Sequence, residues 1–432
     1  MLHSHEALDR PGGTSNSHLF SPLRHRDFRV LWVGMAVSLV GDGIFIVAVA
    51  WEAYSLWNSP YALALVGIGG TIPTVLFLLP GGVVSDRFDR RSVMLWADVL
   101  RGLAVGTLAV LAFAGVLRLW ELVALVGVYG IGSAFFTPAF DAIVPDLLPV
   151  DDLAAANALD QFVRPIAFRL VGPALGGVLV AAGAGFAFAV DAASFAVSGV
   201  AVLLMRRQVQ PWHEQPAAAV TAAMAEGLRF VRQRVWLWGT LVSAAFAYLV
   251  FLGPTEVLLP YVVKNTLHES PAILGLVFAA GGIGAIGAAV LMGHRRHPRR
   301  DVTVMYATWT IATLAVVGYG LATAAWQLMM ACLLFNALET AGTIVWATMK
   351  QRHVPASMLG RVSSLDWLIS IGLLPLSFAL TAPIASIFGA RATLVGAGLI
   401  GGAITLSALF LPGMRDIEGQ SSAQPALTPS QA

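Results

Sequence analysis

Isolated charges inside long apolar stretches are the residues of this sequence best placed to do chemistry. Asp42 lies midway along residues 30–50, where every other residue is uncharged, and a glycine flanks it on each side. A charge at bilayer depth costs about 2.5–3.5 kcal/mol, so such residues usually face a cavity or a partner. Burial favours the neutral form of a carboxylate, which allows proton binding and release near neutral pH. Asp42 therefore predicts a proton or substrate site; the alternative is a structural carboxylate bonded to a neighbouring helix.

Three further charges could take the same role. Glu52 lies ten residues after Asp42, about 15 Å further along a helix and roughly 80° around it, where water could reach it. Glu339 lies deep in a later apolar stretch. Arg169 precedes a glycine-rich segment and could oppose Asp42 from another helix. Glu52, Arg169 and Glu339 therefore join Asp42 as candidate proton or substrate residues.

Other charges in the apolar stretches are spaced to pair with one another. Asp160 and Arg164 are four residues apart with the acid first, which is the favourable order for an ion pair on a helix. Asp98 and Arg101 are three residues apart and are expected to pair as well. The acids expected to be simply solvated are Asp191 and Asp366.

A charged turn separates two of the apolar stretches, residues 61–84 and 92–116. Its acid can accept hydrogen bonds from a helix N-terminus, and its arginines can pair with carboxylates on neighbouring helices. Asp141 ends a later stretch within reach of Arg90. The turn could therefore latch one conformation by ion pairs that break in another. The residues expected to form this latch are Gly82, Asp86, Arg87, Arg90, Arg91 and Asp141.

A second short segment combines glycines with a proline inside an apolar stretch. Residues 172–177 read Gly-Pro-Ala-Leu-Gly-Gly. Small residues allow membrane helices to approach closely, and a proline removes a helical hydrogen bond. We therefore expect a closely packed helix that can kink. The residues that carry this expectation are Gly172, Pro173, Gly176 and Gly177.

The composition excludes most classes of protein. Hydrophobic residues make up 57% of the 432 residues and charged residues only 12%, whereas soluble domains carry about 25% charge. An integral membrane protein is the class that fits. The net charge of +2 gives no indication of nucleic-acid binding, and the single cysteine, Cys332, excludes an internal disulfide framework. We expect no metal, no cofactor and no catalytic residue, because no phosphate loop, metal-ligand spacing or nucleophile motif stands out, so the protein is not expected to be an enzyme.

The hydropathy pattern predicts an all-α fold with twelve transmembrane helices, since about 20 apolar residues span a bilayer. The expected domains are a tail (1–28), a six-helix half (29–205), a linker (206–234), a second six-helix half (235–411) and a tail (412–432). The loop at 293–300 repeats the place and the arginines of the turn at 82–91, so the halves are expected to be pseudo-symmetric. The predicted spans are 29–56, 61–84, 92–116, 120–140, 154–182, 186–205, 235–262, 271–293, 302–323, 326–349, 359–386 and 391–411.

The distribution of Lys and Arg predicts the orientation in the membrane. With both ends inside, the inner segments hold 20 of the 26 basic residues, the outer loops 3 and the spans 3. Cytoplasmic loops of membrane proteins carry such an excess. We therefore expect a multi-pass protein of the inner (plasma) membrane with both termini in the cytoplasm, and no cleavable signal peptide.

The turn at 82–91, read as G-x-x-x-D-R-x-x-R-R, resembles the signature loop of the major facilitator superfamily, with Asp89 where that family usually has glycine. The segment at 172–177 matches the end of the antiporter motif of drug exporters in this superfamily; Leu159 and Phe168 replace its earlier glycines. Residues 41–43, 135–145 and 253–261 look like the macrolide-efflux and enterobactin-exporter-like branch. The resemblance implies a substrate site between the two halves.

The resemblance implies a secondary active exporter of drug-, antibiotic- or siderophore-like small molecules that works by alternating access and proton antiport. Its partners would be the small-molecule substrate, protons and the lipid bilayer, with no nucleic acid, and it is expected to be a monomer. One alternative is an importer or lipid flippase of the same fold. Another is a non-transporting membrane sensor, which would need a large soluble domain; the longest stretch between spans is only 206–234.

Overall fold

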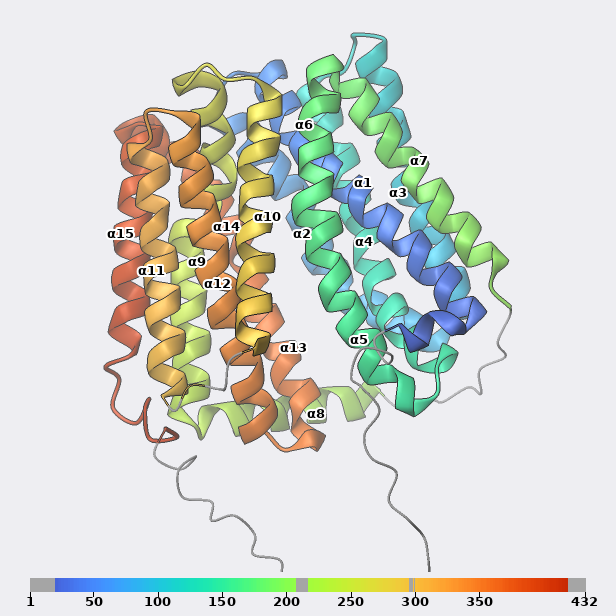
Figure 1. Cartoon of the computed structure of the whole chain (residues 1–432), viewed down its shortest axis with the longest axis vertical. Coiled ribbons are helices and arrows are strands. Elements are labelled where there is room, and N and C mark those ends of the chain that lie inside the picture. The colour runs from blue at the N-terminus through green and yellow to red at the C-terminus, as the bar shows by residue number, and fades with distance from the viewer. Residues whose placement is uncertain (1–19, 207–216, 295–297, 299, 419–432) are drawn as a thin grey trace, which may run out of the picture.

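The structure is a computed structural model that describes residues 20–206, 217–294, 298 and 300–418. Within these residues all regular structure is helical, and twelve helical segments are long and apolar enough to cross a membrane. The predicted all-α membrane fold with twelve spans in two halves is confirmed (Figure 1).

The first half begins with a short turn, η1 (Ser21–Arg24), and contains six spans. Its fifth span is built from three consecutive helices, and the other five spans are one helix each. In chain order the helices are α1 (Arg26–Leu56), α2 (Pro60–Arg87), α3 (Arg90–Phe113), α4 (Leu119–Leu147), α5 (Val150–Arg164), η2 (Pro165–Val171), α6 (Gly172–Ala182) and α7 (Ala184–Leu204).

The second half also has six spans; its fifth span is built from two helices, and a short π-helical stretch, η3 (Val262–Thr266), extends its first span. In chain order its helices are α9 (Val235–Tyr261), η3 (Val262–Thr266), α10 (Pro271–His294), α11 (Asp301–Leu321), α12 (Ala325–His353), α13 (Ala356–Gly372), α14 (Leu374–Phe388) and α15 (Ala390–Ala408).

Prolines account for the two interrupted spans. In the first half, Pro165 begins η2, a π-helical stretch that separates α5 from α6. In the second half, α13 ends at Gly372 and α14 restarts just before Pro375. A proline lacks the N–H of the helical ladder and its ring displaces the preceding turn. Both fifth spans are therefore interrupted next to a proline.

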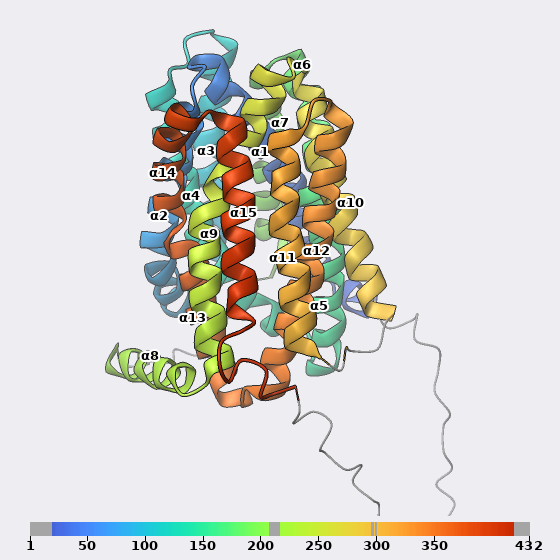
Figure 2. The same ribbon diagram turned by 90° about the vertical axis from the view of Figure 1, so that its left-hand side faces the viewer.

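One further helix, α8 (Ala217–Arg232), connects the two halves and lies across one end of the molecule (Figures 1 and 2). Arg361 of α13 forms an ion pair with Glu226 of α8, which fixes this helix to the second half. This helix lies within the linker predicted at 206–234. We call the end at which α8 lies the α8 end, and the opposite end the far end.

The two halves touch at the far end and separate toward the α8 end (Figure 1). Along α10, a Cβ atom added to Gly275 would lie 2.4 Å from the carbonyl oxygen of Pro173, in the other half. Nearer the α8 end, Gly287 and Gly293 of the same helix have no such neighbour within 4 Å. The contact between α6 and α10 therefore closes the far end, while the other end stays open.

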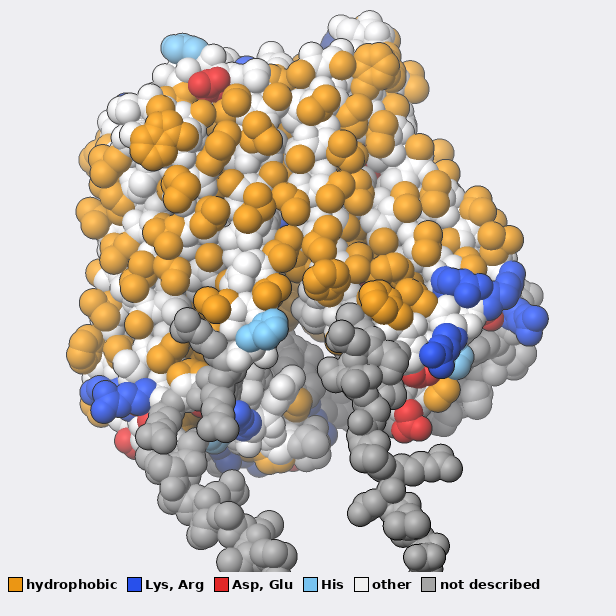
Figure 3. Space-filling model, in the orientation of Figure 1, with side chains coloured by type: hydrophobic (Ala, Val, Ile, Leu, Met, Phe, Trp, Pro, Cys, Tyr) orange, Lys and Arg blue, Asp and Glu red, His pale blue; other side chains and the backbone are white. Residues whose placement is uncertain are grey.

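The surface agrees with a membrane location. Hydrophobic side chains cover most of the face shown in Figure 3, whereas most of its charged side chains gather toward the α8 end. Exposed large side chains such as Leu76, Trp96 and Leu103 are more than half accessible to solvent in the absence of lipid. A belt of this kind is stable only against hydrocarbon.

Candidate functional site

A cavity lies between the two halves. One part, of about 680 Å³, is lined mainly by the first half and includes Asp42, Arg101 and Asp141. An adjoining part, of about 570 Å³, is lined mainly by the second half. Phe168, Arg169, Glu339 and Thr343 line both parts, so the two form one space. Phe168 and Arg169 belong to η2, and Glu339 and Thr343 belong to α12.

Asp42 faces the first part of this cavity from the middle of α1. The hydroxyl group of Tyr129 on α4 donates a hydrogen bond of 2.7 Å to its Oδ1 atom. The flanking glycines allow two helices to pack against this turn of α1. A Cβ on Gly41 would lie 2.2 Å from Ser194 Oγ of α7, and one on Gly43 would lie 2.6 Å from the carbonyl oxygen of Phe168. Asp42 is therefore held at the crossing of α1 with α7 and η2.

A buried ion pair stands beside Asp42. Arg101 Nη2 lies 2.5 Å from Asp98 Oδ1, and Ser198 Oγ donates a 2.7 Å hydrogen bond to Asp98 Oδ2. The guanidinium group is enclosed between two rings, with its Cζ atom 4.3 Å from the centroid of Phe136 and 4.5 Å from that of Phe195. The expected pair of Asp98 and Arg101 therefore forms, and Arg101 also acts electrostatically on Asp42.

Asp191 completes this group, and the expectation that it is solvated is wrong. Asp191 is 0% exposed. Ser194 Oγ donates a 3.3 Å hydrogen bond to Oδ1, while Oδ2 has no hydrogen-bond partner. A Cβ on Gly41 would lie 2.4 Å from Asp191 Oδ1, which places this carboxylate against the turn that carries Asp42. Three carboxylates, Asp42, Asp98 and Asp191, thus lie around Arg101, and this cation acts electrostatically on all three.

The sequence reasoning missed Asp191 and Tyr129, although one signal for Asp191 was present. Asp191, Ser194 and Ser198 are spaced three and four residues apart in an otherwise apolar span, so they lie on one face of α7. A polar stripe of this kind in a membrane helix indicates a buried polar contact. Tyr129 offers no comparable signal, because a tyrosine in an apolar helix is common.

Arg169 does not oppose Asp42. Its Nη1 atom donates a 3.1 Å hydrogen bond to Asn336 Oδ1 of α12, so it bridges the two halves across the cavity. It also acts electrostatically on Glu256 of α9. Arg101 and Arg164 are the cations that act on Asp42. Asp160 and Arg164 form the expected pair at 3.2 Å.

The other two candidate acids lie in different places. Glu339 lines both parts of the cavity and accepts a 3.0 Å hydrogen bond from Thr343 Oγ1. Among the described residues no Lys, Arg or His lies within ion-pair distance of Glu339. Glu52 is absent from the residues that line the cavity, and Lys264 acts on it electrostatically. The structure thus groups Glu339, but not Glu52, with the central space.

Asp366, expected to be solvated, is engaged in contacts on the second-half side of the cavity. Lys350 Nζ lies 2.5 Å from its Oδ2 atom, and Trp346 Nε1 donates a 2.9 Å hydrogen bond to the same oxygen. The cation therefore neutralises Asp366, and Glu339 remains without a cationic partner in this wall.

The expected pair between Arg90 and Asp141 is wrong. Arg90 Nη1 lies 2.5 Å from Asp146 Oδ2 and donates a 2.7 Å hydrogen bond to the carbonyl oxygen of Ala142. Asp141 instead lines the cavity, where Arg164 acts on it electrostatically. Asp146 therefore ties the start of α3 to the end of α4.

The remaining residues of the turn have separate contacts. Arg91 donates to the carbonyl oxygens of Val202 and Leu203 at 2.7 and 2.5 Å, which satisfies the open C-terminal end of α7. Asp89 caps α3 by accepting a 3.3 Å hydrogen bond from the N–H group of Ser92. Gly82 has no neighbour within 4 Å of an added Cβ, Arg87 is exposed in the last turn of α2, and the side chain of Asp86 lies outside the described part of the chain.

The glycines of the 172–177 segment pack on both halves. A Cβ on Gly172 would lie 2.7 Å from Gly43 Cα, and one on Gly176 would lie 3.0 Å from Ile44 Cα, so both face α1. Gly177 faces α10, because a Cβ there would lie 2.8 Å from the carbonyl oxygen of Pro271. Gly172 begins α6 directly after η2, and Pro173 follows it in the first turn. This segment therefore links the Asp42 turn to the contact that closes the far end.

Twelve spanning helices in two halves around a central cavity define a transporter of the major facilitator type. Residues 17–430 match the family described as transmembrane secretion effector, and the chain belongs to this family of the major facilitator superfamily. The superfamily and macrolide-efflux resemblance seen in the sequence is thereby confirmed.

Named relatives cover most of the chain. Macrolide efflux protein A of Streptococcus pyogenes is 23% identical over 366 residues, which are 84% of this chain and 90% of that protein. Multidrug efflux pump Tap of Mycolicibacterium fortuitum is 29% identical over 392 residues, 88% of this chain and 94% of that protein. A POT family transporter solved in complex with 5-aminolevulinic acid has a TM-score of 0.66 at 13% identity over 88% of this chain and 95% of its own, which shows a shared fold.

Proposed function

We propose that this protein exports drug- or antibiotic-like small molecules, siderophore-like metabolites included, by alternating access coupled to proton entry. The support for export is that relatives spanning most of the chain are named as efflux proteins. The support for alternating access is a central cavity with one closed and one open end, because an exporter must expose the same site to each side in turn.

The excess of Lys and Arg supports an orientation in which the α8 end faces the cytoplasm of the cell. In this proposal the tails at 1–28 and 412–432 and the linker at 206–234 are cytoplasmic, and the protein acts as a monomer in the plasma membrane. The cavity is then open to the cytoplasm, where an exporter collects its substrate.

The observation that carries proton coupling is the group of three buried carboxylates around one guanidinium. Asp42 and Arg101 line the cavity, while Asp98 and Asp191 are 1% and 0% exposed. With all three carboxylates ionised, the group and Arg101 together would carry a net charge of −2, which is an expensive state away from water. Binding of a proton from the cavity relieves this excess. Asp42 is the carboxylate through which we expect the proton to enter, because of its place at the cavity wall.

The geometry also suggests how a proton could affect the closed end. Asp42 lies between Gly41, which packs on α7, and Gly43, which packs on the backbone of η2. The chain continues from η2 into α6, which touches α10 in the other half. A change in the charge of Asp42 therefore acts on the helix turn that supports the contact between α6 and α10.

Substrate efflux in inside-out vesicles, with and without an imposed pH gradient, tests this proposal. We expect the wild-type protein to accumulate a macrolide or another drug only with the gradient. Asp42→Asn should lose this accumulation but retain downhill exchange, since the amide resembles the protonated acid. Full accumulation by Asp42→Asn would remove this residue from the proton pathway.

Asp416→Asn is the matched control, because Asp416 is an exposed acid after the last span. It should accumulate substrate as the wild type does. Asp191→Asn extends the test: if the three carboxylates share the proton, this variant should also weaken coupling. If no member of a panel of drugs, antibiotics and siderophores is accumulated by the wild-type protein, proton-driven export itself is wrong.

A further inference from the structure

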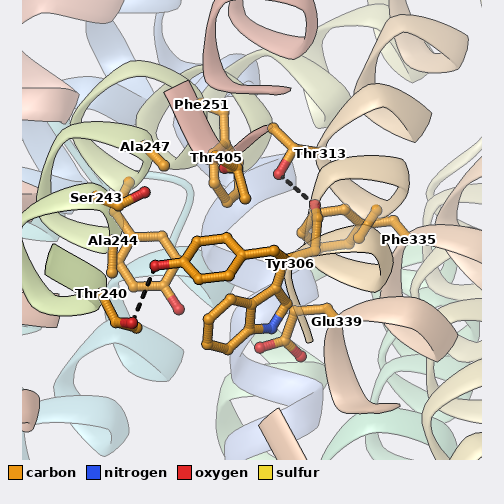
Figure 4. A pocket seen from close by; sticks show the side chains of 13 residues that line it. Thr240, Ser243, Ala244, Ala247, Phe251, Tyr306, Thr313, Phe335, Glu339 and Thr405 are labelled. Carbon is orange, nitrogen blue, oxygen red and sulfur yellow. Dashed lines mark hydrogen bonds between the residues drawn. The ribbon is translucent and has the colours of Figure 1, made fainter. Parts of the chain in front are cut away.

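The second half contributes a small side pocket to the cavity, enclosed by α9, α11, α12 and α15 (Figure 4). Its volume is about 40 Å³, and it shares Tyr248, Trp309, Phe335 and Glu339 with the adjoining chamber of about 570 Å³. The pocket can therefore admit a small head group, while the chamber can take a bulky body.

We propose that this pocket binds the ammonium group of an amphiphilic organic amine, so that the exported molecules are cationic amphiphiles recognised by the second half. This inference rests on the proposed export function and specifies the substrate class of the same cavity. Glu339 supplies the charge, the rings surround the head group, and the chamber receives the apolar body.

The first argument is the charge of this wall. Among the described residues, Glu339 accepts one side-chain hydrogen bond, from Thr343, and has no cation within ion-pair distance. The nearby Asp366 is already occupied by Lys350 at 2.5 Å. A carboxylate on a cavity wall without a cation is stabilised by one from the ligand. An anionic ligand would be repelled from the same place.

The second argument is an unused polar atom inside the pocket. Ser243 is only 6% exposed, and its Oγ atom has no hydrogen-bond partner in the part of the chain that the structure describes. Leaving a buried hydroxyl group without a hydrogen-bond partner is unfavourable. The hydroxyl groups of the neighbouring Thr240 and Tyr306 form a hydrogen bond of 2.9 Å with each other and not with Ser243 (Figure 4). An ammonium N–H group in the pocket would give Ser243 the missing partner.

The third argument is the aromatic lining. Phe251, Tyr306 and Phe335 stand around the pocket together with Glu339 (Figure 4), and Trp309 is also part of its wall. Aromatic faces attract ammonium groups, most strongly away from water. Aromatic walls also suit an apolar body of varied shape, because the ring faces make few directional demands.

The two halves of the cavity differ in whether their charged groups are paired within the protein. In the first half, Tyr129 donates to Asp42, Ser198 donates to Asp98 and Arg101 pairs with Asp98, although Asp191 Oδ2 and Arg101 Nε have no hydrogen-bond partner among the described residues. In the second half, Glu339 and Ser243 retain unused capacity. The first half is thus organised around its own charges and the second around a ligand.

Binding to the purified full-length protein in nanodiscs separates this inference from transport. The probes are dansylcadaverine, a fluorescent primary amine, and its N-acetyl derivative, which has the same body without the charge. We expect the amine to bind at least about tenfold more tightly at neutral pH, and Glu339→Gln to remove about tenfold of its affinity while leaving the acetylated probe unchanged. Glu269→Gln, a change of the same kind in a loop outside the cavity, is the matched control.

A second variant tests the pocket itself. Ser243→Val fills it and removes the hydroxyl, so it should weaken binding of the amine more than binding of the acetylated probe. Equal affinities for the two probes, or an unchanged amine affinity in Glu339→Gln, would overturn the inference even if the vesicles export other molecules. Charge-dependent binding without any gradient-driven export would leave the cation site standing and contradict only the proposed transport function.

Discussion

The contact between α6 and α10 offers the most direct test of alternating access. A Cβ on Gly177 would lie 2.8 Å from the carbonyl oxygen of Pro271 and 3.0 Å from Gly275 Cα. All of these neighbours are backbone atoms, which cannot rotate away, so Gly177→Ala must push the two helices apart. Overpacking of this kind costs about 1–3 kcal/mol.

This cost applies only while the far end is closed. In a conformation that opens the far end, α6 and α10 separate and the added methyl group meets no clash. Gly177→Ala should therefore change the ratio of the two conformations by about 5- to 150-fold in favour of the state open at the far end. The fold should persist, because the methyl group faces the partner half and does not enter the core of its own half.

Spin-label distances measure this ratio. Labels at Asn157 of α5 and Ser364 of α13, both exposed and on opposite halves, report the width of the α8 end in a Cys332→Ala background. We expect a shorter distance to gain population in Gly177→Ala. Gly287→Ala is the matched control, because Gly287 lies in α10 with no neighbour within 4 Å of an added Cβ. An unchanged distribution in Gly177→Ala would show that this contact does not close the far end, and an equal shift in Gly287→Ala would assign the effect to helix propensity.

Two further predictions concern the charged turn and the orientation. Arg90→Ala should slow transport by up to about fivefold in a protein that still inserts, since a partly exposed ion pair contributes about 1 kcal/mol or less. Asp146→Asn should have the same effect, because Asp146 is the ion-pair partner of Arg90. Wild-type transport rates in both variants would show that the turn only determines topology. A phosphatase fused after residue 432 should be inactive in intact cells, because we place this terminus in the cytoplasm; an active fusion would reverse the orientation.

The spans could be predicted from the sequence because each depends on local composition alone. Residues 61–84, for example, contain no charge and form the apolar part of α2. The interruption of the fifth span was less visible. Pro165 stands in it like several other membrane-span prolines, yet α2 runs through both Pro73 and Pro80 without a break. Whether a proline interrupts a helix depends on how the neighbouring helices satisfy the freed backbone groups.

Contacts between helices could not be predicted, because they depend on the rotation of each helix about its axis. Arg90 contacts Ala142 and Asp146, which are four residues apart and therefore share a face of α4. Asp141 is one residue earlier, about 100° around the helix, and this rotation turns it into the cavity. The sequence indicated the right end of the right helix and the wrong carboxylate.

The same limit explains Asp191. Asp191 lies near the start of the predicted span 186–205, and it was expected to be solvated there. Its environment comes from α1, which approaches so closely that a side chain on Gly41 would overlap with Asp191 and Ser194. A close approach between helices far apart in the chain requires knowledge of both surfaces. Glycines beside a buried acid indicate that another helix approaches closely, but they do not indicate which helix.

The place of η2 joins the two proposed sites. Its backbone touches α1 at Gly43, next to Asp42, and touches α10 at Gly282, where a Cβ would lie 2.4 Å from the carbonyl oxygen of Arg169. The side chain of Arg169 reaches Asn336, one turn before Glu339 on α12. A π-helical stretch is a local irregularity of the kind found often at functional sites. This π-helical segment thus packs against the turn of α1 that carries Asp42 and, through Arg169, against the face of α12 that carries Glu339. We therefore expect binding at either site to act on the same seven residues of η2. Coupling between two sites on opposite halves requires such a shared element.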